Sequence, residues 1–305
     1  MISNPPALEK FKNRISWKDI KHEKLRSYLQ ICLEEEIGAK SNNKRPDLTS
    51  EACNISQNGA AKLVARENLT ICGLPLIEEL LTVYNANSLS IELFFEDGDC
   101  VSKGDAIARI KGSQKLILLT ERTILNFIQK LSGIATKAHL FSKITESDGV
   151  HLLDTRKTTP GLRELEKYAS ACGGSFNHRM GLYDRILIKD NHLAAKGIIE
   201  IEDLCIFLSK IKKKNPEIIT EVEIDDIKYL IPAIESGIDA VLLDNFNPDQ
   251  VKEAVRINQN RVVLESSGGI NENSLKKFSK AKPHFISSGA PIHSSRWMDI
   301  GLDWE

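Results

Sequence analysis

The sequence predicts an α/β protein in which an α+β region precedes a (β/α) barrel, either complete or incomplete. Two observations predict the barrel. From about residue 145, short apolar runs typical of buried strands alternate with helical segments, which indicates a parallel sheet. No Gly-rich dinucleotide-binding motif follows any of these runs, which disfavours an open doubly wound sheet. The six runs are VHLLD, RILIKD, IITEVEI, AVLLDN, RVVLESSGG and HFISSGA.

The composition is that of a globular protein, with 305 residues, 41% of them hydrophobic, and a formal net charge of −1. A nearly neutral chain offers no overall attraction to nucleic acid or to an anionic membrane, so we expect neither as a partner. The six cysteines form no C-x-x-C pair, which predicts reduced thiols. No signal peptide or membrane-spanning run is evident, so we expect a soluble, cytoplasmic protein.

The N-terminal third mixes polar helical segments with a loop-rich stretch at residues 41–54 and with short strands further on. Asp97-Gly98 and Lys103-Gly104-Asp105 are turn sequences of the kind that separates short strands. This region is therefore expected to be α+β.

A long helix is predicted from Glu121, where the sequence reads ERTILNFIQKLSGIATKAHLFSKI. Apolar residues recur at the spacing of one helix face, namely Ile124, Ile128, Leu131, Ala135 and Ala138, and Leu125 and Phe127 widen that face. Arg122 projects away from this face at roughly 100° per residue, so its side chain is expected to be solvated.

Each apolar run of the second half ends in polar residues. In a parallel barrel these ends lie on one face, which is where barrel enzymes carry their active sites. Six runs would therefore deliver polar groups to one basin. These groups are Asp154-Thr155-Arg156-Lys157, Lys189-Asp190-Asn191, Glu221 with Glu223, Asp244-Asn245, Glu265 to Gly269, and Ser287-Ser288-Gly289.

The basin is expected to be divided by charge. Cations from its first two strand ends and the intervening loop suit carboxylates or phosphates; they are Arg156, Lys157, His178, Arg179 and Lys189. Glu223 and Asp244, from the middle strands, suit ribose hydroxyls or a Mg²⁺ ion that keeps most of its waters. A salt-bridge network with the cations is the alternative. The segments SSGG (266–269) and SSGA (287–290) either cradle a phosphate or simply turn the chain.

The stretch DTRKTTPG (154–161) also carries a helix-start signal. Thr159 is predicted to cap a helix whose first residue is Pro160. No G-x-S-x-G, H-E-x-x-H or P-loop motif is present, and Cys172 beside Gly173 is interpreted as packing at a helix end. The residues thus indicate a barrel enzyme for anionic substrates that uses Mg²⁺ and no side-chain nucleophile.

Residues 154–192, DTRKTTPGLRELEKYASACGGSFNHRMGLYDRILIKDNH, closely resemble quinolinate phosphoribosyltransferases, also called nicotinate-nucleotide pyrophosphorylases (carboxylating). Supporting matches cover most of residues 60–295; they are ENLTICGLPLIEEL, EDGDCVSKGD, ERTILNFIQKLSGIAT, EVEI, LLDN, SSGGI and ISSGAPIHS. The resemblance implies an N-terminal α/β sandwich domain followed by an incomplete (β/α) barrel. On this basis we expect the first domain with its linking helix at residues 1–130, the barrel at 131–291, and a tail at 292–305 that packs on the first domain.

The resemblance also implies a reaction. A pentosyltransferase of this family joins quinolinate to 5-phosphoribosyl-1-pyrophosphate and releases nicotinate mononucleotide, pyrophosphate and CO₂ in de novo NAD biosynthesis. By resemblance, the quinolinate carboxylates would be held by Arg156, His178, Arg179 and Lys189. Catalytic roles would fall to Lys157 and Lys189 beside the phosphoribosyl donor, and to Glu223 and Asp244.

Further roles follow from the same resemblance. Glu223 and Asp244 would hold the ribose hydroxyls and a hydrated Mg²⁺. The 5-phosphate would lie in two loops, Ser267-Gly268-Gly269 and Ser288-Gly289-Ala290. Arg122 would enter the site of a neighbouring subunit in a homodimer. The sequence departs from the family pattern at a polar insertion around residues 38–47 and at Ser175, Phe176 and Pro291.

Two other functions remain open on the sequence. One is a phosphoribosyltransferase of the same fold that acts on another acid, either nicotinate or the substrate of the molybdenum-associated relatives. The other is a non-catalytic barrel that senses a phosphorylated metabolite. Two separate cationic positions, Arg156 and the His178-Arg179 pair, favour a dicarboxylate. Carboxylates in an anion pocket would repel a ligand that is only bound, so Glu223 and Asp244 favour an enzyme.

Overall fold

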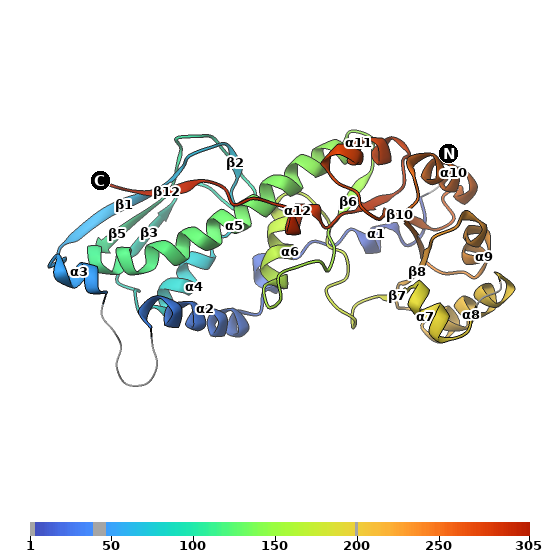
Figure 1. Cartoon of the computed structure of the whole chain (residues 1–305), viewed down its shortest axis with the longest axis horizontal. Coiled ribbons are helices and arrows are strands. Elements are labelled where there is room, and N and C mark those ends of the chain that lie inside the picture. Colours follow the sequence, from blue (N-terminus) through green and yellow to red (C-terminus); the bar gives the residue numbers. More distant parts are fainter. Residues whose placement is uncertain (1–3, 39–46, 199–200) are drawn as a thin grey trace. The chain divides into compact units, whose positions relative to one another are not determined.

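The computed structural model describes residues 4–38, 47–198 and 201–305, which fold as two compact units (Figure 1). The barrel unit comprises the chain up to Arg14 together with Ala138–Ser294, and the sheet unit comprises Ile15–Lys137 together with Ser295–Glu305. The units therefore interleave along the chain. The polar insertion noted around residues 38–47 lies, apart from its two ends, outside the described residues.

The sheet unit is built on a four-stranded antiparallel sheet with the order β12-β1-β5-β3. These strands are β12 (Ile300–Trp304), β1 (Asn58–Ala65), β5 (Ala106–Ser113) and β3 (Ser90–Leu93), and a separate pair joins β2 (Leu69–Thr70) to β4 (Cys100–Val101). Its helices are η1 (Trp17–Asp19), α2 (His22–Ile37), α3 (Leu48–Ala52), α4 (Leu76–Val83) and the first part of α5 (Gln114–Glu146).

The turns predicted near β4 are confirmed. Gly98 and Gly104 adopt φ values of 100° and 95°, which a side chain would disfavour. The long helix is confirmed as well, because α5 buries the whole predicted apolar face, from Ile124 to Ala138. Arg122 is exposed on α5, as expected.

The barrel unit contains a six-stranded parallel sheet with the order β6-β11-β10-β9-β8-β7. β6 and β7 are the two edges of this order, so the barrel is incomplete. Each of the six predicted apolar runs contains one strand: β6 (His151–Leu153), β7 (Ile186–Ile188), β8 (Thr220–Ile224), β9 (Ala240–Asp244), β10 (Val263–Ser267) and β11 (Phe285–Ser287).

Helices follow the strands in the order expected of a barrel. They are α6 (Arg163–Cys172), α7 (Asp190–Ala195), α8 (Ile201–Lys214), η2 (Ile227–Tyr229), α9 (Leu230–Glu235), α10 (Pro248–Asn258), α11 (Glu272–Lys280) and α12 (Ala290–His293). None of the described helices combines the length and the apolar character that crossing a membrane requires.

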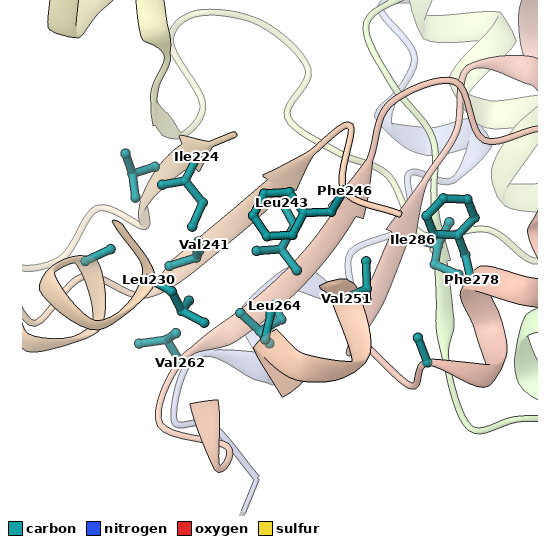
Figure 2. Packing of buried hydrophobic residues seen from close by; sticks show 14 of the residues in the cluster. Ile224, Leu230, Val241, Leu243, Phe246, Val251, Val262, Leu264, Phe278 and Ile286 are labelled. Atoms are coloured by element: carbon teal, nitrogen blue, oxygen red, sulfur yellow. The ribbon is translucent and has the colours of Figure 1, made fainter. Parts of the chain in front are cut away.

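Alternation along the strands sorts their side chains into two layers. Val241, Leu243, Leu264 and Ile286 point outward and pack against the helices, as Figure 2 shows with Phe246, Val251 and Phe278. The residues between them on the same strands point to the inside of the sheet. That inside face carries the polar chemistry described below.

The base of the inside face is apolar and is filled by the start of the chain. α1 (Leu8–Phe11) packs there against Ala240, Val263 and Phe285. The Phe11 and Phe285 rings lie 5.6 Å apart, and the Arg185 guanidinium lies 4.0 Å over the Phe11 ring. This base closes one end of the barrel and leaves the carboxyl ends of the strands for the site.

Candidate active site

A cavity of about 750 Å³ lies at the carboxyl ends of the barrel strands. Its lining includes every candidate site residue named from the sequence except Arg122, which belongs to the sheet unit. The candidates in the cavity are Arg156, Lys157, His178, Arg179, Lys189, Glu223, Asp244, Ser267, Gly268, Gly269, Ser288, Gly289 and Ala290. All six strand ends therefore contribute residues to one cavity, but five of the residues expected in the basin do not line it, namely Asp154, Asp190, Asn191, Glu221 and Ser266.

The arginines of the cavity are placed for an anionic ligand. Within the described part of the chain, the buried Nε of Arg156 has no hydrogen-bond partner. Arg179 is buried and donates from Nη1 to the backbone oxygen of Arg185 at 3.2 Å. Burial, followed by the charge of Arg156, lowers the pKa of Arg179. Two like charges held close together indicate a site that an anion would complete.

The carboxylates line the same cavity beside these cations. Glu223 forms an ion pair with Lys189, and Asp244 accepts a hydrogen bond from Nδ2 of Asn245 at 2.8 Å. Part of the salt-bridge alternative is thus present, in the Lys189–Glu223 pair. Oxygen ligands of this number suit Mg²⁺, which commonly binds through one or two carboxylates and keeps its waters.

The two loops rich in serine and glycine approach other loops closely. A Cβ at Gly268 would lie 2.3 Å from Oδ1 of Asn245, and the Gly268 φ is 102°. A Cβ at Gly289 would lie 2.8 Å from the His293 ring and 3.1 Å from Cδ of Lys157. Gly268 therefore requires glycine, because its φ is positive and a Cβ would also lie 2.6 Å from the backbone nitrogen of Asn245, whereas a Cβ at Gly289 would meet only side-chain atoms. Both glycines leave backbone bare at the cavity wall.

At the cavity wall, a buried cluster joins His178 to two strand carboxylates for which the sequence predicted a place in the basin but no role. His178 Nε2 is 3.5 Å from Oε1 of Glu265 and 3.8 Å from Oε2 of Glu221, and Arg185 Nη1 is 3.3 Å from Glu221. Burial and the charge of Glu265 raise the pKa of Glu221 to about 7. Burial opposes ionisation of Glu265 too, but His178, Ser287 and Arg185 outweigh it and lower that pKa.

The tautomer of His178 follows from its surroundings. Its Nδ1 accepts a hydrogen bond from the backbone N–H of Arg179 at 2.7 Å, so the proton lies on Nε2. A protonated Nε2 cannot ligate a metal, although His178, Glu221 and Glu265 have ligand atoms within 4.8 Å of one another. The ring instead directs an N–H toward the two carboxylates. Their place was recoverable from strand alternation, since Glu221 shares a face with Glu223 and Glu265 with Ser267.

The predicted helix start in DTRKTTPG is wrong. α6 begins at Arg163, with Leu162 at the capping position, so Thr159 and Pro160 lie before the helix. Thr159 instead donates from its N–H and its hydroxyl to the carboxylate of Glu166, at 2.7 and 2.6 Å. Glu166, which lies inside the helix, thus holds the turn at Thr159. Helix-capping preferences alone could not predict this contact.

Other cavity residues had no motif to mark them. Thr155 and Asn245 were noted only as strand-end residues, and Leu187 and Leu242 lie inside predicted strands. His293 and Ser294 follow the last barrel loop. The free state of all six cysteines agrees with the expected reduced thiols.

An incomplete parallel barrel with cations, carboxylates and glycine-rich loops at its carboxyl end defines a barrel enzyme class for small anionic, phosphorylated substrates. Within that class, the family model described as quinolinate phosphoribosyl transferase, C-terminal domain, matches residues 134–303, and the N-terminal domain model matches residues 47–132. The chain belongs to the quinolinate phosphoribosyl transferase family.

Relatives and solved structures agree with this placement. The chain is 38% identical to the probable nicotinate-nucleotide pyrophosphorylase [carboxylating] of Bacillus subtilis, over 92% of this chain and 94% of that protein. It is 33% identical to the probable enzyme of the same name from Synechocystis, over 90% of each. The structure of the nicotinate-nucleotide pyrophosphorylase from Francisella tularensis superimposes with a TM-score of 0.87 at 33% identity, covering 96% of this chain and 100% of that one.

Proposed function

We propose that the chain is a decarboxylating quinolinate phosphoribosyltransferase. It would convert quinolinate and 5-phosphoribosyl-1-pyrophosphate into nicotinate mononucleotide, pyrophosphate and CO₂, the step that supplies the pyridine nucleotide in de novo NAD biosynthesis. The observation that carries the proposal is that one cavity is lined by Arg156, Lys157, Glu223 and Asp244 together with the two glycine loops. Family membership gives the reaction, and the cavity supplies groups suited to both substrates.

Quinolinate requires two cationic positions because it carries two carboxylates. Arg156 comes from the end of β6, and His178 with Arg179 comes from the loop before β7, so two segments of the chain supply the cations. Arginine can grip a carboxylate through two parallel hydrogen bonds. Lys189 lines the same cavity and pairs with Glu223, where it would serve both substrates.

The phosphoribosyl donor would lie toward the middle strands. Lys157 and Lys189 would stabilise its pyrophosphate, and Glu223 and Asp244 would accept hydrogen bonds from the ribose hydroxyls and hold a hydrated Mg²⁺. When bound, Mg²⁺ would neutralise charge that develops on the departing pyrophosphate. Ser267-Gly268-Gly269 and Ser288-Gly289-Ala290 would cradle the 5-phosphate.

The chemistry needs no protein nucleophile. Loss of pyrophosphate creates positive charge on the ribose, which the carboxylates Glu223 and Asp244 can stabilise in a partly buried site. Decarboxylation then breaks the bond to the carboxylate and leaves an electron pair on a ring carbon beside the cationic ring nitrogen, which stabilises it electrostatically until the carbon takes up a proton from water. The protein therefore acts chiefly by positioning the two substrates.

A direct assay tests the proposal. The purified protein is incubated with 5-phosphoribosyl-1-pyrophosphate and carboxyl-labelled quinolinate, and pyrophosphate and ¹⁴CO₂ are followed together. We expect both products in equal amounts. Turnover of nicotinate with none of quinolinate would reject the assignment in favour of a same-fold enzyme for another acid.

Metal dependence separates an enzyme from a metabolite sensor. Turnover is expected to stop with a chelator and to return with added Mg²⁺, because the donor pyrophosphate would otherwise leave with its charge uncompensated. Tight binding of both ligands without any metal-dependent product would favour the sensor.

We also propose that the enzyme acts in the cytoplasm as a homodimer in which Arg122 of one subunit completes the site of the other. Free thiols and a near-neutral charge support the compartment. The exposure of Arg122 on α5 leaves its guanidinium available to a partner.

A further inference from the structure

The loop that carries His178 and Arg179 is attached to the barrel by a buried ion pair outside the cavity. Asp154 directly follows β6, and Lys167 lies on α6. Their side chains form an ion pair, and both are fully inaccessible to solvent. Neither residue lines the cavity.

Both backbone polar groups of His178 are held by this pair. Oδ1 of Asp154 accepts the His178 N–H at 2.8 Å, and Nζ of Lys167 donates to the His178 carbonyl oxygen at 2.9 Å. Asn177 links the two, since its Nδ2 donates to Asp154 at 2.7 Å and to the Lys167 backbone oxygen at 3.0 Å. One step earlier, Phe176 is hydrogen-bonded to the backbone beside β6.

The side chain of His178 has a protein group against each ring nitrogen. Nδ1 accepts a hydrogen bond from the Arg179 N–H, and Nε2 lies 3.5 Å from Oε1 of Glu265. Every polar atom of His178 therefore has a protein group against it. These contacts fix the orientation of His178. Because Arg179 is the next residue, they also fix the position of its backbone.

Stability alone does not account for a buried pair of this kind. Burial raises the pKa of Asp154 and lowers that of Lys167, so each charged form is disfavoured by its surroundings, and the pair offsets only part of this cost. Well-packed apolar side chains of similar volume are often as stabilising as a buried ion pair. The hydrogen bonds to His178 are what apolar side chains could not supply.

We propose that Lys167 and Asp154 are positioning residues that hold His178 and Arg179 in the geometry required to grip the substrate carboxylates. This inference rests on the proposed function, because it takes quinolinate as the ligand of that loop. Neither residue touches substrate. They act through the backbone of His178, and small misplacements of a binding group lower catalytic efficiency sharply.

The expected effect is selective. Glu223 on β8 and Asp244 on β9 come from other strands and would keep their places when the loop loosens. The KM for quinolinate should therefore rise by roughly 10- to 100-fold in Lys167→Met, while the KM for 5-phosphoribosyl-1-pyrophosphate changes far less. Loss of folded protein would act differently, since it lowers apparent kcat and leaves both KM values unchanged.

Two further variants keep the test independent of folding. Asn177→Ala loosens the same loop without leaving a buried charge unpaired, and it should raise the quinolinate KM in the same selective way. The double variant Asp154→Asn with Lys167→Gln removes both charges and keeps an acceptor and a donor for the His178 backbone, but it loses the hydrogen bond from Asn177 to the second oxygen of Asp154. Its quinolinate KM should lie between those of the wild type and Lys167→Met.

Leu275→Ala on α11 is the control for general destabilisation, because Leu275 is fully buried in the barrel core and absent from the cavity lining. It should leave both KM values unchanged. Failure of the wild type to turn over quinolinate would refute the proposed function and not the loop attachment. With an active wild type, the inference is overturned if Lys167→Met and Asn177→Ala change kcat alone or raise both KM values equally.

Discussion

The cavity residues differ in whether their polar atoms already have partners within the protein. Arg156 has a buried Nε without a partner among the described residues, whereas Glu223 is already paired with Lys189. An unsatisfied buried donor has a free-energy cost that a bound carboxylate would remove. Arg156 is therefore the side chain whose environment most directly calls for an anionic ligand.

Replacing Arg156 with lysine should weaken quinolinate specifically. Lysine keeps the charge but loses the two-pronged geometry, and a hydrogen bond to a charged group contributes about 1.5–3 kcal/mol. We expect the quinolinate KM to rise roughly 10- to 100-fold, with a smaller change for the phosphoribosyl donor. Steady-state kinetics with each substrate varied in turn gives both values.

Arg256→Lys is the matched control, because Arg256 is exposed on α10 and pairs only at the surface with Glu253. Its kinetics should equal those of the wild type. An Arg156→Lys variant with an unchanged quinolinate KM would remove Arg156 from the carboxylate site.

Among the elements, β11 is preceded by a histidine whose neutral form the fold requires. His284 Nδ1 accepts the Leu264 N–H at 2.9 Å, and Nε2 lies 3.2 Å from Oδ1 of Asn260. Protonation of Nδ1 would break the first of these bonds. Burial, with a contribution from His151, lowers the pKa of His284 to about 4.

The sign of the resulting pH dependence is defined by the two pKa values. The pKa of His284 is 6.5 in the unfolded chain and about 4 in the folded protein. The stability that its neutral form gives is therefore fully present above pH 6.5 and is lost as the pH falls toward 4. The difference corresponds to roughly 3 kcal/mol of unfolding free energy. Urea unfolding of the wild type and His284→Asn from pH 7 to pH 4 measures it, because asparagine offers an acceptor that does not titrate.

At each pH, the unfolding free energy of His284→Asn is subtracted from that of the wild type. The contributions of the other titrating groups, which both proteins share, then cancel. The wild type should lose more stability than His284→Asn across this window. Parallel pH profiles for the two proteins would show that His284 is not responsible.

Gly133 lies on α5 where the C-terminal segment contacts that helix. Replacing it with alanine would have two opposite effects on stability. Alanine there would gain about 1 kcal/mol of helix propensity. Its Cβ, however, would lie 2.0 Å from the backbone oxygen of Arg296, and backbone cannot move aside as a flexible side chain could. Overpacking typically costs about 1–3 kcal/mol.

We therefore expect Gly133→Ala to destabilise the protein and to free the segment that continues into β12. Two hydrogen bonds hold this segment on α5, from Met298 N to the Gln129 oxygen at 3.0 Å and from Gln129 Nε2 to the Ile300 oxygen at 2.7 Å. Urea unfolding and limited proteolysis near residue 296 measure the two effects. A variant as stable as the wild type would mean that propensity outweighs the contact.

Elements with a strong period were predictable, and those fixed by distant partners were not. The six strands and the apolar face of α5 follow from alternation and helical spacing within the sequence itself. The helix start at Thr159 was wrong because Glu166, seven residues further on, binds that turn. α1 fills the base of the barrel through contacts with β9, β10 and β11, which no local pattern could reveal.

The candidate site divides in the same way. Residues at strand ends were found because parallel strands deliver their ends to one face. Glu221 and Glu265 lie deeper on the same strands, and their meeting with His178 depends on strand register. No signal in the sequence marked Lys167, since its partner Asp154 is brought to it by the fold.

For the whole molecule, the interleaved units mean that one chain cannot be cut simply into two folding domains. The first residues belong to the barrel unit, and the last strand, β12, pairs with β1 of the sheet unit. A truncated chain that begins at residue 131 would lack α1. We expect it to expose Phe285 and Val263 at the barrel base and to be far less soluble than the full chain, which sedimentation of the two expressed proteins would measure.

The homodimer proposed from the family resemblance predicts that two inactive variants can restore activity when they form a mixed dimer. Arg122→Ala and Arg156→Ala subunits, each inactive alone, should form heterodimers with one complete site, which combines Arg156 of the first subunit with Arg122 of the second. Random mixing should restore about a quarter of wild-type activity, because half the dimers are mixed and each has one working site. Mixing Arg122→Ala with the double variant should restore nothing, which controls for exchange alone. Purified, doubly tagged heterodimers without activity would show that Arg122 does not act across the interface.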